Sequence, residues 1–200
     1  METIALSQKA LDKAITALRD GDVIIFPTDT VYGFLADASN KKAVDKIYKI
    51  KKRPKSKPLS VFVKDLKMAE SLVKVDERQA KILKKFWPGQ YTFILKRKKT
   101  SLTNPTAVGF VRLYGLNKKT IAIRIPKHTF LQKLLKKVNR PLAQTSVNIS
   151  GELPLINIGD IIEKFGSDKN ILIISAGDLK KSKPSKITDL TNNTIKTLRK

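Results

Sequence analysis

The strongest constraint on the fold is a series of short apolar runs, rich in β-branched residues, that alternate with segments of helical periodicity. The runs are DVIIF at 22–26, LSVFV at 59–63, YTFIL at 91–95, TIAIRI at 120–125, PLAQTSVN at 141–148 and ILII at 171–174. Runs of this length, bounded by Pro, Gly or polar residues, are typical of buried strands. Strands and helices that alternate in this way indicate an α/β domain with a mixed sheet.

Helical segments separate these runs. Ser7 is a candidate N-cap for a helix that Gly21 ends and whose apolar face is Ala10, Leu11, Ala14, Ile15 and Leu18. Asn40 is a candidate cap for a helix over 40–50. We expect further helices at 65–73, 76–86, 128–138 and near 159–165, a further strand within VGFVRLY at 108–114, and a hairpin-like piece around ITDL and TIKTL.

Composition excludes several classes of site. The chain has no cysteine and one histidine, His128, which excludes disulfides, zinc–thiolate sites, iron–sulfur clusters and a cysteine nucleophile. We expect no metal site in the protein and ordinary surface exposure for His128. Its 200 residues, 41% of them hydrophobic, fit one domain over residues 1–200. No apolar run is long enough for a membrane span and no secretory signal is present, so we expect a cytoplasmic protein.

The net charge of +24 attracts polyanions such as nucleotides and RNA. Nearly all of the excess is lysine, which an AT-rich coding sequence also produces, whereas specific phosphate recognition relies more on arginine. Both interpretations of the charge stay open at this point.

Two polar motifs follow predicted elements at positions where open α/β sheets bind ligands. In KKRPKSKP at 51–58, two prolines stiffen a loop in which Lys51 supplies a point charge and Arg53 a planar fork, which together suit a triphosphate. In QTSVNISG at 144–151, strand alternation places Ser146 and Asn148 on one face, where they can bind a phosphate or a ribose. Taken singly, the motifs also fit a solvated basic loop and a polar strand end.

Three further segments are weaker candidates. PTDTVYG at 27–33 offers threonine hydroxyls and Gly33, which permits a sharp bend. Arg124 lies inside an apolar strand, so its charge needs a partner, either a substrate carboxylate or an internal one such as Asp29 or Asp189. KPSKITD at 183–189 is a polar loop that contains Ser185.

Taken together and in this order, these segments resemble the YrdC-like family. The matching pieces, which cover most of 22–190, are PTDTVYG, KIYKIKKRPKSKPLSVFV, FWPGQYTFIL, IAIRIPKH, TSVNISG and PSKITDL. The pairing of a K-x-R with a distant S-x-N is the hallmark of that family. The resemblance implies a twisted mixed sheet flanked by helices, with a basic concave cavity, and a single domain without the extra C-terminal domain of longer members.

The best-known activity of the family implies an enzyme, a nucleotidyltransferase that makes threonylcarbamoyl-AMP and pyrophosphate from L-threonine, bicarbonate and ATP. Mg²⁺ is expected to arrive with ATP, because the sequence has no convincing carboxylate cluster to hold it alone. The product feeds N6-threonylcarbamoylation of adenosine 37 in tRNA, so tRNA and other threonylcarbamoyl-transfer proteins are the implied partners.

The resemblance also implies residue roles. The implied catalytic set is Lys51, Arg53, Ser146 and Asn148, of which the two cations hold ATP phosphates and the other two hold the nucleotide. The implied ATP ligands are this set with Lys57 and Thr120, and the implied threonine ligands are Thr30, Arg124 and Ser185.

The chain departs from the family pattern at Lys52, where glycine is common, and at Lys57, Phe62, Gln90 and Lys186. Two alternatives therefore stay open beside the enzyme. One is a non-catalytic YrdC-like protein that binds tRNA or double-stranded RNA, and the other is a paralogue that makes a different carbamoyl adenylate.

Overall fold

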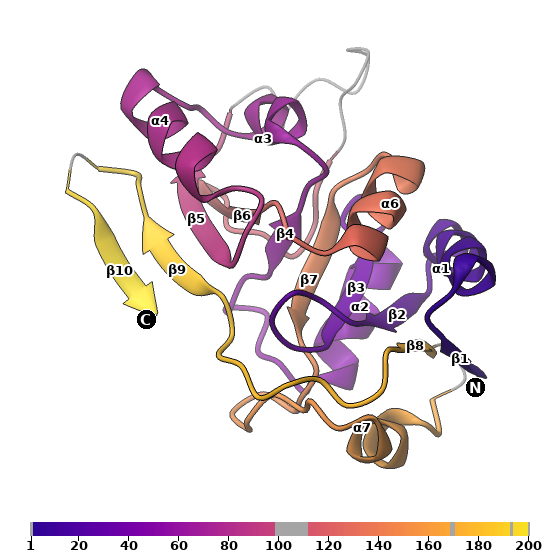
Figure 1. Ribbon diagram of the computed structural model, residues 1–200. Coiled ribbons are helices and arrows are strands. Elements are labelled where there is room, and N and C mark those ends of the chain that lie inside the picture. The colour runs from indigo at the N-terminus through magenta and orange to yellow at the C-terminus, as the bar shows by residue number, and fades with distance from the viewer. Residues whose placement is uncertain (1, 99–111, 169–170, 193, 200) are drawn as a thin grey trace.

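The computed structural model describes residues 2–98, 112–168, 171–192 and 194–199 (Figure 1). The strands are β1 (Glu2–Ala5), β2 (Val23–Phe26), β3 (Gly33–Asp37), β4 (Ser60–Phe62), β5 (Tyr91–Lys96), β6 (Thr120–Arg124), β7 (Leu142–Ser146), β8 (Ile171–Ser175), β9 (Lys186–Asp189) and β10 (Lys196–Arg199). The helices are α1 (Gln8–Asp20), α2 (Lys41–Ile50), α3 (Leu66–Leu72), α4 (Glu77–Phe86), α6 (Thr129–Val138) and α7 (Ile158–Phe165).

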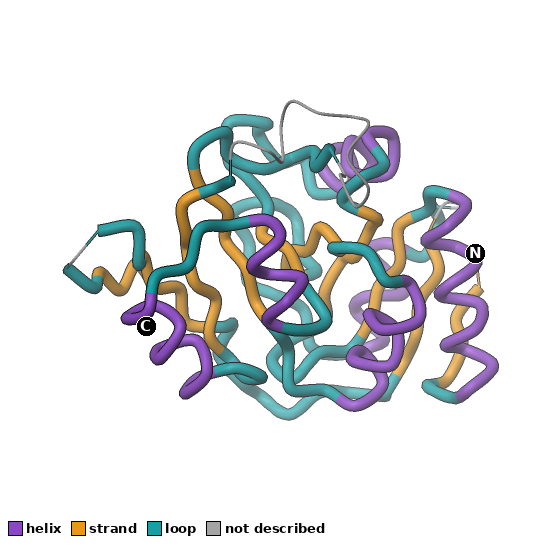
Figure 2. Tube along the Cα trace, turned by 90° about the horizontal axis from the view of Figure 1, so that it is seen from above, coloured by secondary structure: helices purple, strands orange, loops and turns teal. Residues whose placement is uncertain are grey.

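Within the described residues, the strands form one ten-stranded sheet of order β1-β8-β2-β3-β7-β4-β6-β5-β9-β10. The β1–β8, β2–β8, β4–β6 and β5–β9 pairs are parallel. The other neighbours are antiparallel. This confirms the predicted mixed sheet. Figure 2 shows the strands passing through the molecule with helices beside them.

Capping side chains explain where the predicted helices begin. The side chains of Ser7 and Asn40 accept the backbone N–H groups of Ala10 and Ala43, as expected at the first turns of α1 and α2. Gly21 ends α1 with a φ of 82°, a left-handed conformation that glycine adopts without steric cost. The predictions for α3, α4, α6 and α7 are likewise confirmed.

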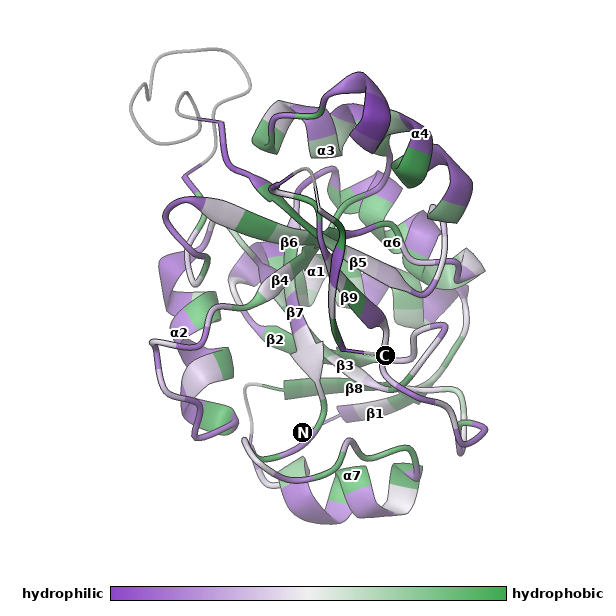
Figure 3. Ribbon diagram, turned by 90° about the vertical axis from the view of Figure 1, so that its left-hand side faces the viewer, coloured by the Kyte–Doolittle hydropathy of each residue, from purple (hydrophilic) through white to green (hydrophobic). Residues whose placement is uncertain are grey.

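The sheet separates two apolar layers. Along β2, Ile24 and Phe26 belong to a cluster with α1 and α6, whereas Val23 and Ile25 belong to a second cluster with α2 and α7. This alternation follows from the pleat of a strand, because successive side chains point to opposite faces. Figure 3 shows hydrophobic and hydrophilic residues side by side along α2 and α7, as expected for helices that cover a sheet with one face.

Two strands lie outside the sequence predictions, namely β1 and β3. The candidate strand at 108–114 falls mostly outside the described residues, and its described part, 112–114, has no strand structure. In the part of the chain that the structure describes, no helix combines the length and the apolarity that a bilayer crossing requires.

Candidate active site

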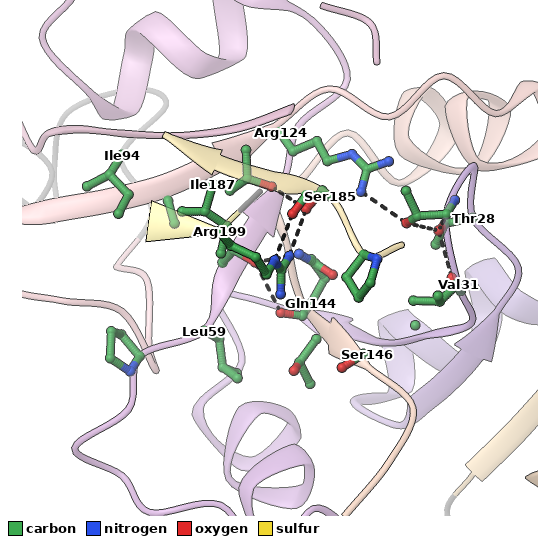
Figure 4. A pocket seen from close by; sticks show the side chains of 18 of the residues that line it. Thr28, Val31, Leu59, Ile94, Arg124, Gln144, Ser146, Ser185, Ile187 and Arg199 are labelled. Atoms are coloured by element: carbon green, nitrogen blue, oxygen red, sulfur yellow. Dashed lines mark hydrogen bonds between the residues drawn. The ribbon is translucent and has the colours of Figure 1, made fainter. Parts of the chain in front are cut away.

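A cavity of about 450 Å³ lies on the face of the sheet that α1 and α6 cover only in part (Figure 4). Its floor consists of alternate residues of neighbouring strands, because one face of a pleated sheet presents every second side chain. These residues are Ser60 of β4, Thr92 and Ile94 of β5, Ala122 and Arg124 of β6, Gln144 and Ser146 of β7, and Ile187 of β9. The 28–33 loop, the segment around Arg53 and the C-terminal residues 198–199 complete the walls.

The cavity wall is cationic, but its cations are not the lysines that dominate the overall charge. Three of the eight arginines of the chain, Arg53, Arg124 and Arg199, line it. Among the described residues that line it there is no lysine and no acidic side chain. Burial lowers the pKa of each of the three guanidinium groups, because their positive charges have lost part of their contact with water. An anion bound among them would stabilise these charges and so offset that cost. The site is therefore suited to multiply charged oxyanions, whose oxygen atoms the planar guanidinium groups can bind in pairs.

The K-x-R segment takes its geometry from the end of α2. The N–H of Arg53 donates to the Tyr48 carbonyl at 2.9 Å and that of Lys52 to the Lys49 carbonyl at 3.1 Å, which is the Schellman pattern. Lys52 has a φ of 50°, the left-handed conformation that this motif requires after the helix. The turn sends the side chains of Lys51 and Arg53 in different directions.

Lys51 lies beneath the cavity rather than in its lining, and it is 1% exposed. Its ammonium group donates to the Ser146 carbonyl at 2.5 Å, to the Asn148 carbonyl at 2.8 Å and to Asn148 Oδ1 at 2.9 Å. Burial, to which the positive charge of Arg53 adds, lowers the pKa of Lys51 to about 7. The structure thus brings together the two distant motifs that the family resemblance pairs.

Arg53 faces the cavity. Its Nε donates to the Lys57 carbonyl and one Nη to the Pro58 carbonyl, each at 3.0 Å, so the chain itself fixes the guanidinium plane. The side chain of Lys57 is exposed and does not line the cavity, and the carbonyl of Lys57 supports Arg53. The expectation that Lys57 binds ATP through its side chain stays a prediction.

The S-x-N segment differs from its predicted form in one respect. β7 ends at Ser146, and Asn148 lies in the bend beyond it instead of continuing the strand. The Asn148 side chain turns back and accepts the Ser146 hydroxyl at 2.7 Å, so Ser146 lines the cavity and Asn148 lies buried behind it.

Arg124 has an internal carboxylate partner. Its Nη2 donates to Asp29 Oδ1 at 2.5 Å, its Nη1 to Thr30 Oγ1 at 3.2 Å and its Nε to the Gly89 carbonyl at 2.9 Å. Of the two internal acids considered from the sequence, Asp29 is therefore the one that pairs with it. Because Arg124 and Thr30 both line the cavity as well, the pair remains in reach of a ligand.

Arg199 comes from β10, at the far edge of the sheet. Its Nε donates to the Ser185 carbonyl at 2.8 Å and its Nη2 to Ser185 Oγ at 3.1 Å, as the dashed lines of Figure 4 show. Ser185 in turn lies 2.8 Å from Thr92 Oγ1. These contacts join β10 to the cavity floor.

The predicted site residues gather around one cavity. The predicted residues that line it are Thr30, Arg53, Thr120, Arg124, Ser146 and Ser185. Sequence analysis missed Gln144, Asn117 and Arg199, which also line it. Gln144 lies two residues before Ser146 on β7, so strand alternation could have identified it. Nothing local in the sequence indicates Arg199, because β10 reaches the cavity through long-range pairing.

His128 is not an ordinary surface histidine, and that expectation is wrong. It is half-buried, it is the N-cap of α6, and its Nδ1 accepts the N–H of Leu131 at 3.2 Å. Burial lowers the pKa of His128, although the negative charge of Asp29 opposes this effect.

Three departures from the family pattern have visible contacts. Gln90 Nε2 donates to the Asp29 carbonyl at 2.5 Å, a bond that proline could not make at this position. The Phe62 ring lies 5.6 Å from the Arg124 guanidinium carbon. Lys186 Nζ lies 5.8 Å from the centre of the Tyr91 ring. The first two of these contacts support the loop and the arginine that line the cavity.

Comparison with known proteins agrees with this geometry. The Sua5/YciO/YrdC family model, described as "Telomere recombination", matches residues 16–200. The chain belongs to this family. The resemblance seen in the sequence is thus confirmed.

Two relatives are 36% identical to the chain. A putative threonylcarbamoyl-AMP synthase of Methanocaldococcus jannaschii aligns over 192 residues, which are 96% of this chain and 86% of the relative. A threonylcarbamoyl-AMP synthase of Bacillus subtilis aligns over 152 residues, which are 76% of this chain but only 42% of the relative. The chain thus spans less than half the length of the Bacillus protein.

Two solved structures have the same fold. P. abyssi Sua5 complexed with L-threonine matches with a TM-score of 0.83 at 29% identity, over 99% of this chain and 56% of that one. E. coli YciO matches with a TM-score of 0.84 at 28% identity, over 100% of this chain and 94% of that one. The fold is therefore shared with P. abyssi Sua5 and with E. coli YciO.

Proposed function

We propose that this chain makes threonylcarbamoyl-AMP and pyrophosphate from L-threonine, bicarbonate and ATP, with the cavity as its active site. The observation that carries the proposal is the arrangement of Arg53, Arg124 and Arg199 around one hollow without acidic lining. A triphosphate and an amino-acid carboxylate are both anions, and guanidinium groups bind pairs of their oxygen atoms through paired N–H donors. The names of the two relatives and the threonine complex of P. abyssi Sua5 support the same substrates.

The proposed contacts of the substrates divide the cavity residues into three groups. Arg124 and Thr30 belong to one group and are the proposed contacts of the threonine carboxylate and its neighbouring atoms. Arg53 and Ser146 belong to the K-x-R and S-x-N side and are the proposed contacts of the nucleotide, as is Thr120, which also lines the cavity. Ser185 and Arg199 lie on the C-terminal side of the cavity, where they add a hydroxyl and a third cation.

The reaction needs positioning and charge neutralisation more than a protein nucleophile. The amino group of threonine adds to bicarbonate and water leaves, which gives a carbamate. A carbamate oxygen then attacks the α-phosphorus of ATP, the bond from that phosphorus to the bridging oxygen breaks, and pyrophosphate leaves with the electron pair. The guanidinium groups would neutralise the negative charge that gathers on the phosphate oxygens.

The residues of the cavity do not fit a resident Mg²⁺ site. Mg²⁺ prefers carboxylate and water oxygens, and the described residues include no group of three or more His, Asp or Glu that could hold a metal. We therefore treat Mg²⁺ as part of the ATP substrate, and no step of the reaction is assigned to it.

The test is pyrophosphate release in the presence of ATP, L-threonine and bicarbonate, with each substrate omitted in turn. Release should require all three, and Arg53→Ala should lower kcat/KM by at least tenfold, which corresponds to about 1.4 kcal/mol. Arg19→Ala is the matched control, because Arg19 is exposed near the end of α1, outside the cavity lining. Release that is independent of threonine would contradict the proposed activity.

The similarity to E. coli YciO favours testing a second adenylate-forming activity in the same assay. A paralogue that uses another amino compound would release pyrophosphate with that compound and not with threonine. A panel of amino acids at equal concentration separates the two.

RNA binding is a further proposal, since the product is destined for a tRNA. Between Glu77 and Glu152 the sequence contains no acidic residue, while Lys and Arg recur throughout, so this segment carries an unopposed positive charge. Affinity for tRNA should then fall steeply as salt rises. Tight, salt-dependent tRNA binding without any ATP turnover would favour a non-catalytic RNA-binding protein. The cytoplasmic location and the transfer proteins that would consume the adenylate stay predictions.

A further inference from the structure

The hydrogen bonds of Lys51 leave no proton for a ligand. The charged ammonium has three N–H donors, and the neutral amine, which a pKa of about 7 also populates, has only two. In this structure all three have protein acceptors, which are the carbonyls of Ser146 and Asn148 and the Oδ1 atom of Asn148. The side chain is 1% exposed and does not line the cavity. A direct bond from Lys51 to a phosphate would require it to leave at least one of these partners.

The orientation of the Asn148 amide is fixed by its own contacts. Its Nδ2 donates to the carbonyls of Ile149 at 2.7 Å and Glu152 at 2.8 Å, so both of its protons are used. Its Oδ1 therefore faces Lys51 Nζ at 2.9 Å and Ser146 Oγ at 2.7 Å. A flipped amide would place its NH2 group against the Lys51 ammonium and its oxygen against the carbonyls of Ile149 and Glu152. Donor would then face donor and acceptor would face acceptor, so these hydrogen bonds would be lost.

This orientation determines the direction of the Ser146 bond. Asn148 Oδ1 carries no proton, so in the contact of 2.7 Å the Ser146 hydroxyl is the donor. The single hydroxyl proton of Ser146 thus points toward Asn148, behind the cavity wall. The oxygen that lines the cavity offers only lone pairs to a ligand.

The backbone holds the same unit together. The N–H of Ser150 donates to the Lys51 carbonyl at 2.8 Å, so the turn after α2 and the loop after β7 are connected in both directions. Arg53, two residues beyond Lys51, is instead anchored on the Lys57 and Pro58 carbonyls and lines the cavity.

We propose that Lys51 is a positioning residue, which holds Asn148 so that Ser146 presents an acceptor oxygen to a hydroxyl or N–H donor of the substrate. This inference rests on the proposed function, and it separates the K-x-R pair into Lys51, which acts through Ser146, and Arg53, which contacts phosphate. The donors tested at Ser146 are a ribose hydroxyl of ATP and the nitrogen of threonine, because both carry protons that an acceptor oxygen can bind.

Inorganic tripolyphosphate is the probe that separates the two roles. It has the acceptor oxygens and the negative charge of the ATP triphosphate but neither a ribose hydroxyl nor an amino group. Binding of tripolyphosphate, ATP and L-threonine is measured by titration calorimetry on the full chain. The variants are Lys51→Met, Ser146→Ala and Arg53→Met, with Lys52→Met as the matched control, because Lys52 is exposed and carries the same charge.

Lys51→Met and Ser146→Ala should each leave tripolyphosphate affinity within about twofold of the wild type, since neither removes a phosphate contact. Each should weaken ATP or threonine by about fivefold or more, the loss of one hydrogen bond in a partly buried site. The double variant should weaken that ligand no further than one single variant does, because the two residues act as a unit. Arg53→Met should weaken tripolyphosphate itself, and Lys52→Met should weaken none of the three.

Deoxynucleotides distinguish the two possible donors. If a ribose hydroxyl is the donor, the wild type prefers ATP over 2′-deoxy-ATP or 3′-deoxy-ATP, and both variants lose that preference. If the nitrogen of threonine is the donor, the wild type prefers threonine over its analogue without the amino group, 3-hydroxybutyrate, and both variants lose this preference instead. Either result supports the proposal, which predicts a lost donor preference and unchanged tripolyphosphate binding.

The proposal is overturned if Lys51→Met weakens tripolyphosphate as much as Arg53→Met does, which would make Lys51 a phosphate ligand. Unchanged binding of all three ligands by Lys51→Met would also overturn it, because the lysine would then only support the fold. If Lys51→Met does not fold, Ser146→Ala decides, since a loss of tripolyphosphate affinity there would show that the hydroxyl donates to phosphate. A wild-type protein that binds neither ATP nor tripolyphosphate would instead overturn the proposed function and this inference with it.

Discussion

Arg124 and Asp29 form an ion pair with an N–O distance of 2.5 Å, although 95 residues separate them, and their side chains are 2% and 9% exposed. Asp29 also accepts the backbone N–H of Lys127 through its second oxygen at 3.0 Å. The pair therefore joins the 28–33 loop to the end of β6. Three of the five N–H donors of Arg124 have partners among the described residues, and the others are the ones that a substrate carboxylate could use.

Asp29→Ala should lower the free energy of unfolding by about 3 kcal/mol, because it leaves the buried guanidinium without its counter-charge. It should also raise the KM for threonine, since Arg124 then loses its fixed orientation. Urea denaturation and the pyrophosphate assay measure the two effects. Asp45→Ala is the control, because the ion pairs of Asp45 with Lys41 and Lys55 lie at the surface. Equal changes in unfolding free energy and in KM for the two substitutions would show that the buried ion pair contributes no more than a surface ion pair.

Arg199→Gln should lower kcat/KM for pyrophosphate release by at least about tenfold, or about 1.4 kcal/mol, because it removes one of three positive charges on the cavity wall. Glutamine keeps an amide that can still donate a hydrogen bond to Ser185, so the main change is the loss of the positive charge. Arg19→Gln, at an exposed position of α1, should stay within about twofold of the wild type. Equal rates for both variants would place Arg199 outside the machinery.

The elements that local sequence signals specify were predicted well. Ser7 and Asn40 cap α1 and α2 as expected, because a cap is a contact between residues three positions apart. β3 was missed because Gly33, Ala36 and Asp37 have low strand propensity, and its pairing with β2 and β7 depends on residues far away in the sequence. β1 was missed because its mostly exposed side chains show no alternation.

The site residues also divide into those that local sequence signals identify and those that depend on long-range pairing. The motifs around Arg53 and Ser146 could be identified locally, and their meeting at one cavity could be expected only from the resemblance. Arg199 could not be found, because the expected hairpin pairs β9 with β10 but does not show that β9 pairs with β5, which brings β10 to the cavity. Gly33 was expected to make a sharp bend, but it begins β3 without a left-handed φ. Its role is to start the strand beside Ser146.

Lys52→Gly should raise the free energy of unfolding by about 1 kcal/mol, because residue 52 is left-handed, with a φ of 50°, and a side chain there costs roughly 1–2 kcal/mol that glycine avoids. This also explains why glycine is common at the middle position of K-x-R in the family. Lys52→Ala keeps the Cβ atom and should change stability by less than about 0.5 kcal/mol. Urea denaturation of the three proteins checks this, and equal stability of the glycine and alanine variants would contradict it.

His128 should show a pKa below its ordinary value of 6.5, because the half-buried ring loses solvation and its Nδ1 must stay unprotonated to accept the Leu131 N–H. As the pH falls below 6.5, the unfolded chain binds a proton at His128 that the folded chain does not, so stability should fall until the pH reaches the folded pKa. His128 is the only histidine, so its Cε1 proton gives one NMR signal whose titration reports this pKa directly.

His128→Asn is the matched variant for this titration, since asparagine is a good N-cap for α6 and does not ionise. The difference in unfolding free energy between the wild type and this variant should shift in favour of the variant as the pH falls from about 7 to about 5, because only the wild type binds an extra proton on unfolding. His128→Ala separates the two contributions, because it removes the cap at every pH and should cost about 1 kcal/mol even at neutral pH. A difference between the wild type and His128→Asn that stays constant with pH, or a folded pKa at or above 6.5, would mean that the capping contact does not favour the neutral ring.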